Sequence, residues 1–342
     1  MHNDGILILK GSEVNSLLVG RELELIQTVR MAYETHARGE SSLPHSTFLR
    51  FPDNQRDRII ALPAYLGDGW EIAGIKWVAS FPGNLEIGLD RASALVVLNS
   101  SRTGRPEAIL EGSIISAKRT AASAALAAQC LHNGNKADRV GLIGCGLINF
   151  EIVRFLLAAQ PEIKQFVVYD LDSARGEQFG RKCRKAFREV EVEAVDDVRT
   201  VLRSSTLISI ATTAVSPYID DLSEISPGSV ILHVSLRDLS PEVILSSDNV
   251  VDDADHVCRA QTSIHLAEQL AGNRHFIRCA LSDILSGQAD ARSHAGSTVI
   301  FSPFGLGILD LAVSKLVRDL GLKQGLGTII DSFLPESWAD DD

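Results

Sequence analysis

Residues 140–170 form the segment that most restricts how this chain can fold. They read VGLIGCGLINFEIVRFLLAAQPEIKQFVVYD: an apolar strand, a glycine turn, an amphipathic helix, a second strand and an acid at its end. A helix N-terminus after such a turn offers backbone N–H groups and partial positive charge to a pyrophosphate. Gly144 can make the tight turn, and Gly146 leaves room for the phosphates. The segment predicts a Rossmann unit that binds a dinucleotide, and the alternative is a purely structural turn.

The acid at the end of the second strand predicts which dinucleotide is bound. Asp170 can accept hydrogen bonds from both ribose hydroxyls of NAD and would repel the 2′-phosphate of NADP, so we expect NAD. Asn149 departs from the motif, because glycine or alanine normally stands there. Cys145 fits the turn as a small residue, with a redox role as the alternative. The full predicted cofactor-binding set is Gly144, Cys145, Gly146, Leu147, Ile148, Asp170, Thr120 and Thr212.

Composition indicates a cytoplasmic enzyme of about two domains. The chain has 342 residues, of which 45% are apolar, and a formal net charge of −11. The acidic balance argues against nucleic acid or an anionic membrane as partner. No apolar run reaches the roughly 20 residues that span a bilayer, and we expect no membrane partner. Five widely spaced cysteines without CxxC pairs predict neither disulfides nor a metal site.

The order of predicted elements suggests that the dinucleotide unit is inserted into another domain. The start of the chain reads as a strand at 6–9, a helix from 11 to 38 and a meander of strands at 58–66, 72–81 and 93–100. An alanine-rich helix at 113–131 leads to the strand at 139–143, with a hinge near their junction. Alternating strands and helices after Asp170 predict a parallel sheet with right-handed crossovers. The segment 297–322 then returns the chain to the first domain.

Several charged residues beside these elements are candidates for chemistry, each with a structural alternative. Lys76 is either a site cation or a surface lysine whose stem covers apolar neighbours. Arg119, on the alanine-rich helix, either binds an anion or lies on a solvated face. Asp238 follows a strand at the edge where parallel sheets place ligands, and the alternative is a loop or N-cap aspartate before Pro241. Arg50 ends a strand-like run and is ambiguous alone.

Long motifs in this chain resemble those of the ornithine cyclodeaminase and mu-crystallin family. They are GIKWVASFPGN, RASALVVLN, TGRPEAILEGSIISAKRTAASAALAA and VGLIGCGLI, in this order and spread over nearly the whole chain. Within the family, GIKW and Ser302-Pro303-Phe304-Gly305 are most similar to the branch that forms L-2,3-diaminopropionate for siderophores and antibiotics. That branch has Asn-Pro-Met-Gly at the second motif, where typical relatives have Lys-Ser-Val-Gly.

The resemblance implies an α/β fold in which a Rossmann-type parallel-sheet domain is inserted into a discontinuous α+β domain. The inserted NAD-binding domain would span residues 131–305. Residues 1–130 and 306–342 would form the domain for substrate binding and dimerisation, and the protein would be a homodimer.

The resemblance also assigns roles to the charged residues. The family's carboxylate-binding cations fall on Arg50, Lys76 and Arg119, and the acid near the reacting carbon falls on Asp238. The loop Ser235–Glu242 is shorter after this acid than in cyclodeaminases, and Arg237 precedes the acid. An additional cation suits a more anionic substrate and argues against cyclisation of ornithine.

The resulting hypothesis is an NAD-dependent oxidation and hydrolysis of N-(2-amino-2-carboxyethyl)-L-glutamate to L-2,3-diaminopropionate and 2-oxoglutarate. Lys76 and Asp238 are the predicted catalytic residues, and Arg91 and Arg237 are candidates for the additional carboxylates of the substrate. The enzymatic alternatives are an ornithine cyclodeaminase, an alanine dehydrogenase or a ketimine reductase. A crystallin-like binding protein without catalysis is the alternative of another class.

Overall fold

The computed structural model describes residues 5–132 and 138–335, which fall into two compact units. The first unit comprises the chain through Arg21, Thr35–Arg119 and the chain from Leu306 onward. The second comprises Glu22–Glu34 and Thr120–Gly305. Residues 133–137, near which the sequence predicted a hinge, lie outside the described residues. The division into a substrate domain and a nucleotide domain, with its predicted boundaries, stays a prediction.

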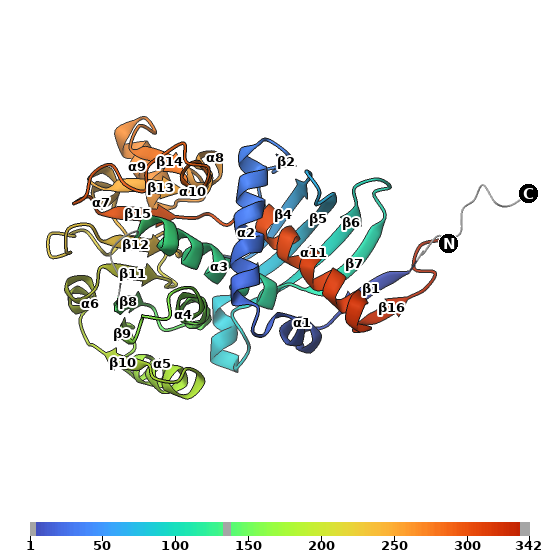
Figure 1. Ribbon diagram of the computed structural model, residues 1–342, viewed down its shortest axis with the longest axis horizontal. Helices are drawn as coiled ribbons and strands as arrows, with labels where there is room; N and C mark the ends of the chain where they lie inside the picture. The colour runs from blue at the N-terminus through green and yellow to red at the C-terminus, as the bar shows by residue number, and fades with distance from the viewer. Residues whose placement is uncertain (1–4, 133–137, 336–342) are drawn as a thin grey trace, which may run out of the picture. The chain divides into compact units, whose positions relative to one another are not determined.

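The second unit is built on an eight-stranded, wholly parallel sheet (Figure 1). In spatial order its strands are β10 (Glu191–Ala194), β9 (Gln165–Tyr169), β8 (Arg139–Ile143), β11 (Leu207–Ile210), β12 (Val230–His233), β15 (Val299–Ser302), β13 (Asp248–Val251) and β14 (Ile277–Ala280). The helices between them are α4 (Leu147–Ala159), α5 (Ser173–Ala186), α6 (Val198–Ser204), α7 (Pro241–Leu245), α8 (Ala254–Val257), α9 (Ser263–Ala271) and α10 (Leu281–Leu285). The predicted α/β fold class with a Rossmann-type parallel sheet is confirmed.

The strand order reverses at β8 and β11, and in open α/β sheets ligands bind at the carboxyl ends of such strands. The chain runs from β8 through β9 to β10 on one side, and then returns to pair β11 with the other edge of β8. Such a reversal leaves a gap between the connections at the carboxyl edge, where open α/β sheets bind ligands. Apolar runs hold this edge in place, because every residue of β11, β12 and β15 is buried.

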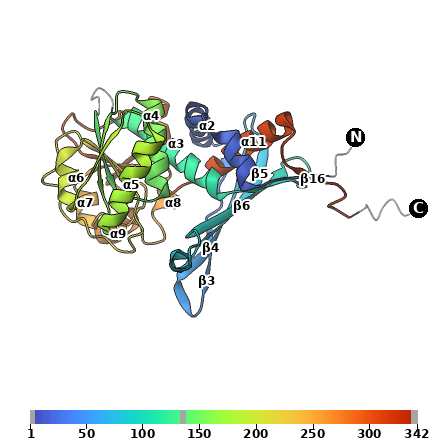
Figure 2. The ribbon, with the colours of Figure 1, turned by 90° about the horizontal axis from the view of Figure 1, so that it is seen from below.

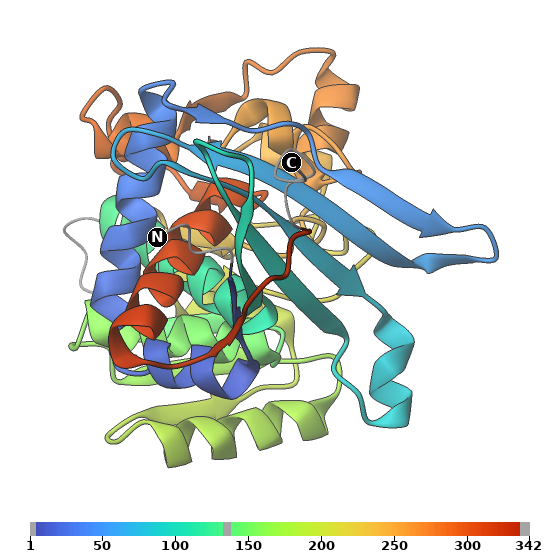
Figure 3. The same ribbon diagram turned by 90° about the vertical axis from the view of Figure 1, so that its right-hand side faces the viewer.

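The first unit is a mixed sheet with a helix against one face. Its strands are β16 (Thr328–Ile330), β1 (Ile6–Leu9), β7 (Pro106–Glu111), β6 (Ala92–Ser100), β5 (Ile72–Ser80), β4 (Asn54–Leu66) and β2 (Ser41–Ser42), with β3 (Thr47–Phe51) also paired to β4. The predicted meander is present, since β4 to β7 pair antiparallel in chain order. Figure 2 shows the β3–β4 hairpin projecting from this sheet, and in Figure 3 α11 (Gly307–Gln324) lies alongside the strands.

Two glycines let α11 approach the sheet closely. A Cβ at Gly74 would lie 2.2 Å from the carbonyl oxygen of Val97 and 3.1 Å from the Leu311 side chain. A Cβ at Gly307 would lie 3.2 Å from the carbonyl oxygen of Leu62. Side chains alternate along a strand, so Lys76 shares the α11 face with Gly74. The first turns of α11 therefore stand directly over Lys76.

The predicted single helix over residues 11–38 is wrong. The chain forms α1 (Gly11–Leu18) and α2 (Glu22–Ala37), separated at Gly20, which has φ +74°. A left-handed residue cannot continue a right-handed helix. The remaining helices are the predicted α3 (Ser113–Leu131) and a short 3₁₀ helix, Pro82–Ile87. In the described part of the chain, no helix is both long and apolar enough to cross a bilayer.

Candidate active site

The glycine turn has the geometry that a dinucleotide site needs. Gly144 has φ +92°, and a Cβ there would lie 2.5 Å from the carbonyl oxygen of Ala211. Its N–H donates to the carbonyl of Tyr169 at 2.8 Å. The turn is therefore squeezed between the ends of β9 and β11, and only glycine fits without displacing backbone.

The N-terminus of α4 stands free beside this turn. Gly146 is the N-cap with φ −102°, and a Cβ there would meet no atom within 4 Å. The N-cap Gly146 has no side chain to cap the helix, and Leu147 in its first turn is exposed. An uncapped helix N-terminus with open space before it is suited to a pyrophosphate, which the N–H groups of Leu147 and Ile148 would receive.

Asn149 departs from the dinucleotide motif, and the structure gives the reason. Its amide donates to the carbonyls of Ile143 at 3.0 Å and Gly144 at 2.7 Å, and its oxygen accepts from the Ser209 hydroxyl at 2.7 Å. The side chain is fully buried. Asn149 thus replaces close helix–strand packing by hydrogen bonds that fasten the turn to β8 and β11.

Asp170 lies where the ribose of a dinucleotide would bind. Its carboxylate accepts from the N–H of Cys145 at 2.7 Å and of Asp172 at 3.1 Å. A carboxylate has about four acceptor positions, so two remain for the ribose hydroxyls. Burial, together with the Asp170 charge, raises the pKa of the Cys145 thiol to about 12. The thiol stays protonated at neutral pH, which disfavours the redox alternative for Cys145.

Asp238 lies in a buried polar cluster at the carboxyl edge of the same sheet. Its oxygens accept short hydrogen bonds from the hydroxyls of Thr212 and Ser235. His233 Nε2 lies 3.3 Å from one of these oxygens and accepts from the Asp238 N–H at 3.2 Å. The Asp238 side chain is 0% exposed. The helix-cap alternative is wrong, because Ser240 caps α7 instead.

Hydrogen bonds keep Asp238 ionised in spite of its burial. Burial alone would raise the pKa of its carboxyl, but His233, Ser235 and Thr212 hold that pKa below its ordinary value. Tyr218, which sequence reasoning missed, is paired with this segment, since its N–H donates to the Asp238 carbonyl at 2.9 Å. Burial and then the Asp238 charge raise the pKa of the Tyr218 phenol. At neutral pH the cluster thus presents an ionised carboxylate, which can accept hydrogen bonds, and a protonated phenol, which can donate one.

In the first unit, Lys76 and Arg119 converge on an acid that sequence reasoning missed. Asp310, on the first turns of α11, accepts from Lys76 Nζ at 2.7 Å and from Arg119 Nε at 3.0 Å. Lys76 also donates to the Ser116 hydroxyl at 3.2 Å. Lys76 is 2% and Arg119 8% exposed, so the surface alternatives for both residues are wrong. The signal for Asp310 was an acid within the apolar run GILDLAV.

The pKa of Lys76 lies nearer to neutral pH than that of an ordinary lysine. Burial lowers the pKa of its ammonium to about 8, with the Arg119 charge adding to this effect and Asp310 opposing it. A lysine with such a pKa can both bind a carboxylate and exchange a proton.

The other predicted cations have contacts of their own. Arg50 is exposed and stacks on the Phe48 ring at 5.6 Å. Arg91 donates to the Ser80 hydroxyl at 3.1 Å. Arg237 donates to the carbonyl of Ala260 at 2.8 Å and so braces a neighbouring loop. Their roles in substrate binding, like that of Thr120 on α3 in cofactor binding, stay predictions.

A second buried acid, Asp252, fixes the Ser302–Gly305 loop that the sequence singled out. It accepts from the N–H groups of Phe304 at 2.8 Å and Gly305 at 2.7 Å. Burial raises the pKa of this carboxyl to about 6. Ser302 in turn contacts His233 Nδ1 at 3.3 Å. The loop motif is thereby connected to the cluster around Asp238.

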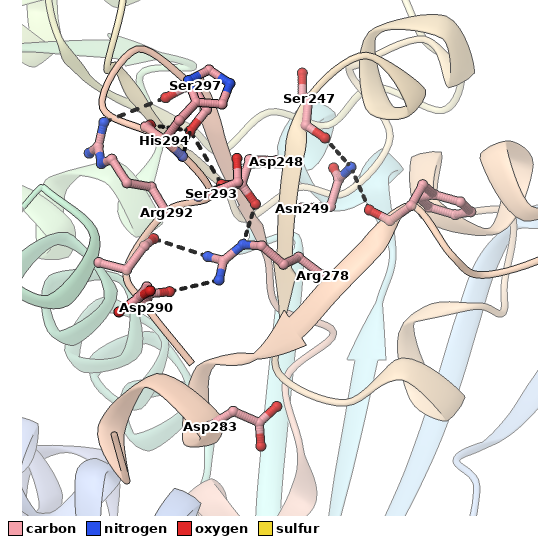
Figure 4. A network of polar contacts seen from close by, with 12 residues as sticks. Ser247, Asp248, Asn249, Arg278, Asp283, Asp290, Arg292, Ser293, His294 and Ser297 are labelled. Atoms are coloured by element: carbon pink, nitrogen blue, oxygen red, sulfur yellow. Dashed lines mark hydrogen bonds and ion pairs between the residues drawn. The ribbon is translucent and has the colours of Figure 1, made fainter. Parts of the chain in front are cut away.

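A cavity of about 790 Å³ lies at the opposite, amino-terminal edge of the parallel sheet. Asp248 and His294 are among its lining residues, and Arg278 donates hydrogen bonds to Asp248 and to the carbonyls of Asp290 and Ala291 (Figure 4). None of the predicted site residues lines this cavity. The network fastens the loop before β15, which is a structural role. Among the described residues, no group of three or more His, Cys, Asp or Glu could hold a metal ion.

Comparison with known proteins identifies the family. The model of the ornithine cyclodeaminase/mu-crystallin family matches residues 7–324. The chain belongs to this family. The resemblance of its motifs is confirmed, and the match includes both the glycine turn and the Lys76–Arg119–Asp310 cluster.

Relatives within the family have different substrates. The chain is 26% identical to an N-((2S)-2-amino-2-carboxyethyl)-L-glutamate dehydrogenase of Staphylococcus aureus, over 97% of this chain and 100% of the relative. A Δ1-pyrroline-2-carboxylate reductase of Thermococcus litoralis, solved with NADH and L-proline, is 26% identical with a TM-score of 0.88 over 95% of this chain and 100% of that one. An archaeal alanine dehydrogenase dimer with bound NAD is 26% identical, with a TM-score of 0.85 over 96% and 100%.

Proposed function

We propose that this protein, an NAD-dependent amino-acid dehydrogenase or reductase of its family, converts N-(2-amino-2-carboxyethyl)-L-glutamate to 2-oxoglutarate and L-2,3-diaminopropionate. The NAD cofactor fits the uncapped α4 N-terminus and Asp170. The observation that carries the choice of substrate is the loop at Asp238, where Arg237 adds a cation beside the acid. Such a loop suits a substrate with three carboxylates better than ornithine, whose distal ammonium Arg237 would repel. The near full-length similarity to the Staphylococcus aureus enzyme supports this choice.

The charged residues have separate tasks in this reaction. Arg50, Lys76 and Arg119 hold the α-carboxylate of the glutamate half, and Arg91 and Arg237 are assigned to the other carboxylates. NAD, when bound, supplies the hydride acceptor. The glutamate Cα loses its hydride, the amine becomes an imine, and a water adds to the imine carbon. Asp238 accepts a proton from the amine or the water, the C–N bond breaks, and the leaving amine takes up a proton.

The test is product analysis with purified protein. With NAD and N-(2-amino-2-carboxyethyl)-L-glutamate, we expect NADH, 2-oxoglutarate and L-2,3-diaminopropionate in equal amounts. Ornithine in place of the conjugate should give no proline. A higher kcat/KM with ornithine, or with L-alanine, would refute the proposed substrate but leave the family assignment intact. Binding of NADH without turnover of any of these amino acids would favour a non-catalytic binding protein.

A cyclic imine reductase is the second candidate, because the Thermococcus litoralis structure superposes over nearly the full chain. Δ1-Pyrroline-2-carboxylate has a single carboxylate, which the Lys76–Arg119 cluster would suffice to bind. The test compares the rate at which this imine oxidises NADH with the rate at which the conjugate reduces NAD. A faster reaction with the imine would favour the reductase.

We also propose that the protein is a homodimer that serves siderophore or antibiotic synthesis. The archaeal alanine dehydrogenase is a dimer. On the sheet face opposite α11, Trp77 and its cross-strand partner Leu95 are about 40% exposed. Exposed apolar sheet faces are a common basis for association. Light scattering should give twice the chain mass for the wild type, and Trp77→Lys should lower it.

A further inference from the structure

Asp310 is a fully buried acid for which the proposed reaction steps have no use. Its side chain is 0% exposed, and its two oxygens bond different cations, Lys76 and Arg119. An isolated carboxylate at such a position would be strongly unfavourable, whereas a paired and hydrogen-bonded one is tolerated. The pairing spans 234 residues to Lys76 and 191 residues to Arg119. Asp310 thus joins strand β5, helix α3 and helix α11 at one point.

The charges in this cluster leave a net charge of +1. Protonated Lys76 and Arg119 contribute two positive charges, and Asp310 contributes one negative charge. The cations also keep unused donors: in the described contacts, Lys76 uses two of three ammonium N–H groups, on Asp310 and Ser116. Arg119 uses Nε on Asp310, with a long contact of 3.5 Å from Nη2 to Ser116. The cluster therefore matches one singly charged anion.

The position of Asp310 is fixed by the backbone. Gly307 lies against β4, and Leu311 packs over Gly74 of β5, so the helix turn that carries Asp310 is held close to the sheet. Sites on rigid elements keep their donors in place without reorganisation during binding. Asp310 can therefore hold Lys76 and Arg119 in one arrangement before any substrate arrives.

We propose that Asp310 is a positioning residue that orients Lys76 and Arg119 and limits their cluster to a single substrate carboxylate. This inference rests on the proposed function and deepens it. The other carboxylates of the conjugate must then be bound outside the cluster. Removing the Asp310 charge should disturb carboxylate binding and the protonation of Lys76 together, because both depend on the same carboxylate.

The sign of the second effect follows from the structure. Burial and Arg119 lower the pKa of Lys76, and only Asp310 opposes them among the causes of its shift. In Asp310→Asn the opposing charge is lost, so Lys76 should release its proton at lower pH than the wild type. In the wild type, kcat/KM should fall at high pH as Lys76 loses its proton, and we call this fall the Lys76 limb of the pH profile. In Asp310→Asn the limb should lie at lower pH.

The experiment compares Asp310→Asn, Asp310→Glu and the matched control Asp319→Asn in the full-length protein. Asp319 lies on the same helix but is paired with Lys315 near the surface, so its variant should behave as wild type. Asp310→Asn should raise KM roughly tenfold or more, as expected for a disrupted buried charge pair, and shift the pH limb toward acid. Asp310→Glu should restore the limb at least in part. Affinity for NADH should not change, because the glycine turn belongs to the other unit.

Calorimetric titration with 2-oxoglutarate separates this inference from the proposed function, because it needs no turnover. Binding that Asp310→Asn weakens would support the inference even if the conjugate is not a substrate. If wild type and Asp310→Asn share one pH limb and one affinity for 2-oxoglutarate, or if the wild type does not bind 2-oxoglutarate, the inference is wrong. Should Asp310→Asn not fold, the double variant Lys76→Met/Asp310→Asn removes one charge of each sign. This double variant should fold and bind 2-oxoglutarate through Arg119. Its pH profile should lack the limb assigned to Lys76, and a retained limb would refute the inference.

Discussion

Gly144 and Gly146 lie two residues apart in one turn, and alanine should affect different properties at the two positions: the stability of the fold at Gly144 and the affinity for NADH at Gly146. At Gly144, the left-handed backbone costs an L-residue about 1–2 kcal/mol. Its Cβ would also lie 2.5 Å from the Ala211 carbonyl oxygen. The backbone would have to shift to relieve this clash. Overpacking of this kind adds about 1–3 kcal/mol, and the stiffer unfolded chain returns about 0.4–1 kcal/mol. Gly144→Ala should therefore destabilise the fold by about 3 kcal/mol.

At Gly146 the backbone has φ −102° and the space around a Cβ is open, so alanine fits the free protein. Its loss of stability should be at most about 1 kcal/mol, the usual cost of a poorer N-cap. Its methyl group would instead stand where the pyrophosphate approaches α4. We expect NADH affinity to fall at least roughly tenfold, which is about 1.4 kcal/mol.

Thermal melting without cofactor and fluorescence titration with NADH measure the two effects separately. For a domain of about 200 residues, 3 kcal/mol corresponds to a Tm lower by roughly 6–12 °C. Gly146→Ala should melt close to wild type yet bind NADH weakly. Gly83→Ala, at an open position in the first unit, should change neither quantity. Equal destabilisation by the Gly144 and Gly146 variants, or normal NADH binding by Gly146→Ala, would refute this reading of the turn.

Three further outcomes are expected. Arg119→Ala should lower kcat/KM by roughly two orders of magnitude, at ~1.4 kcal/mol per decade, with NADH binding unchanged; a near-normal rate would remove Arg119 from the substrate site. Wild-type protein should bind NADH much more tightly than NADPH, and Asp170→Ser should narrow the difference; equal affinities for the wild type would contradict the role of Asp170. Lys76 has a pKa of about 8 and binds carboxylate only when charged, so kcat/KM should fall as pH rises through about 8. A flat pH profile up to pH 10 would count against this role of Lys76.

The nucleotide-binding part could be read from sequence because its requirements are local. A turn that needs glycine, a helix start and an acid after the next strand all occur within 31 residues, and the strand at Arg139–Ile143 has the predicted bounds. Asn149 could not be understood in this way. Its partner Ser209 lies 60 residues later on another strand, and only the folded sheet brings the two together. The break at Gly20 was missed because a helical pattern of apolar residues continues on both sides of it.

The charged residues show the same limit more sharply. Sequence patterns and family resemblance pointed to Lys76 and Arg119, but each alone was compatible with a solvated surface. The deciding partner, Asp310, lies near the other end of the chain. A charge in an apolar helical stripe does indicate a buried partner, since burying it alone is costly, but it does not say which residue that partner is. That information exists only once α11 has packed on β5.

The two titratable groups predicted to be catalytic both have pKa values below their ordinary ones, with different consequences at neutral pH. Hydrogen bonds hold Asp238 ionised, although it is buried, so its carboxylate persists across the neutral range. Lys76 instead has its pKa brought down to about 8, where small changes in its surroundings alter its charge. A group that is ionised throughout the neutral range and a group that titrates near it can take separate base and acid roles. We infer that Asp238 is the constant proton acceptor and that Lys76 is the group whose protonation substrate binding and pH control, a division that sequence reasoning left open.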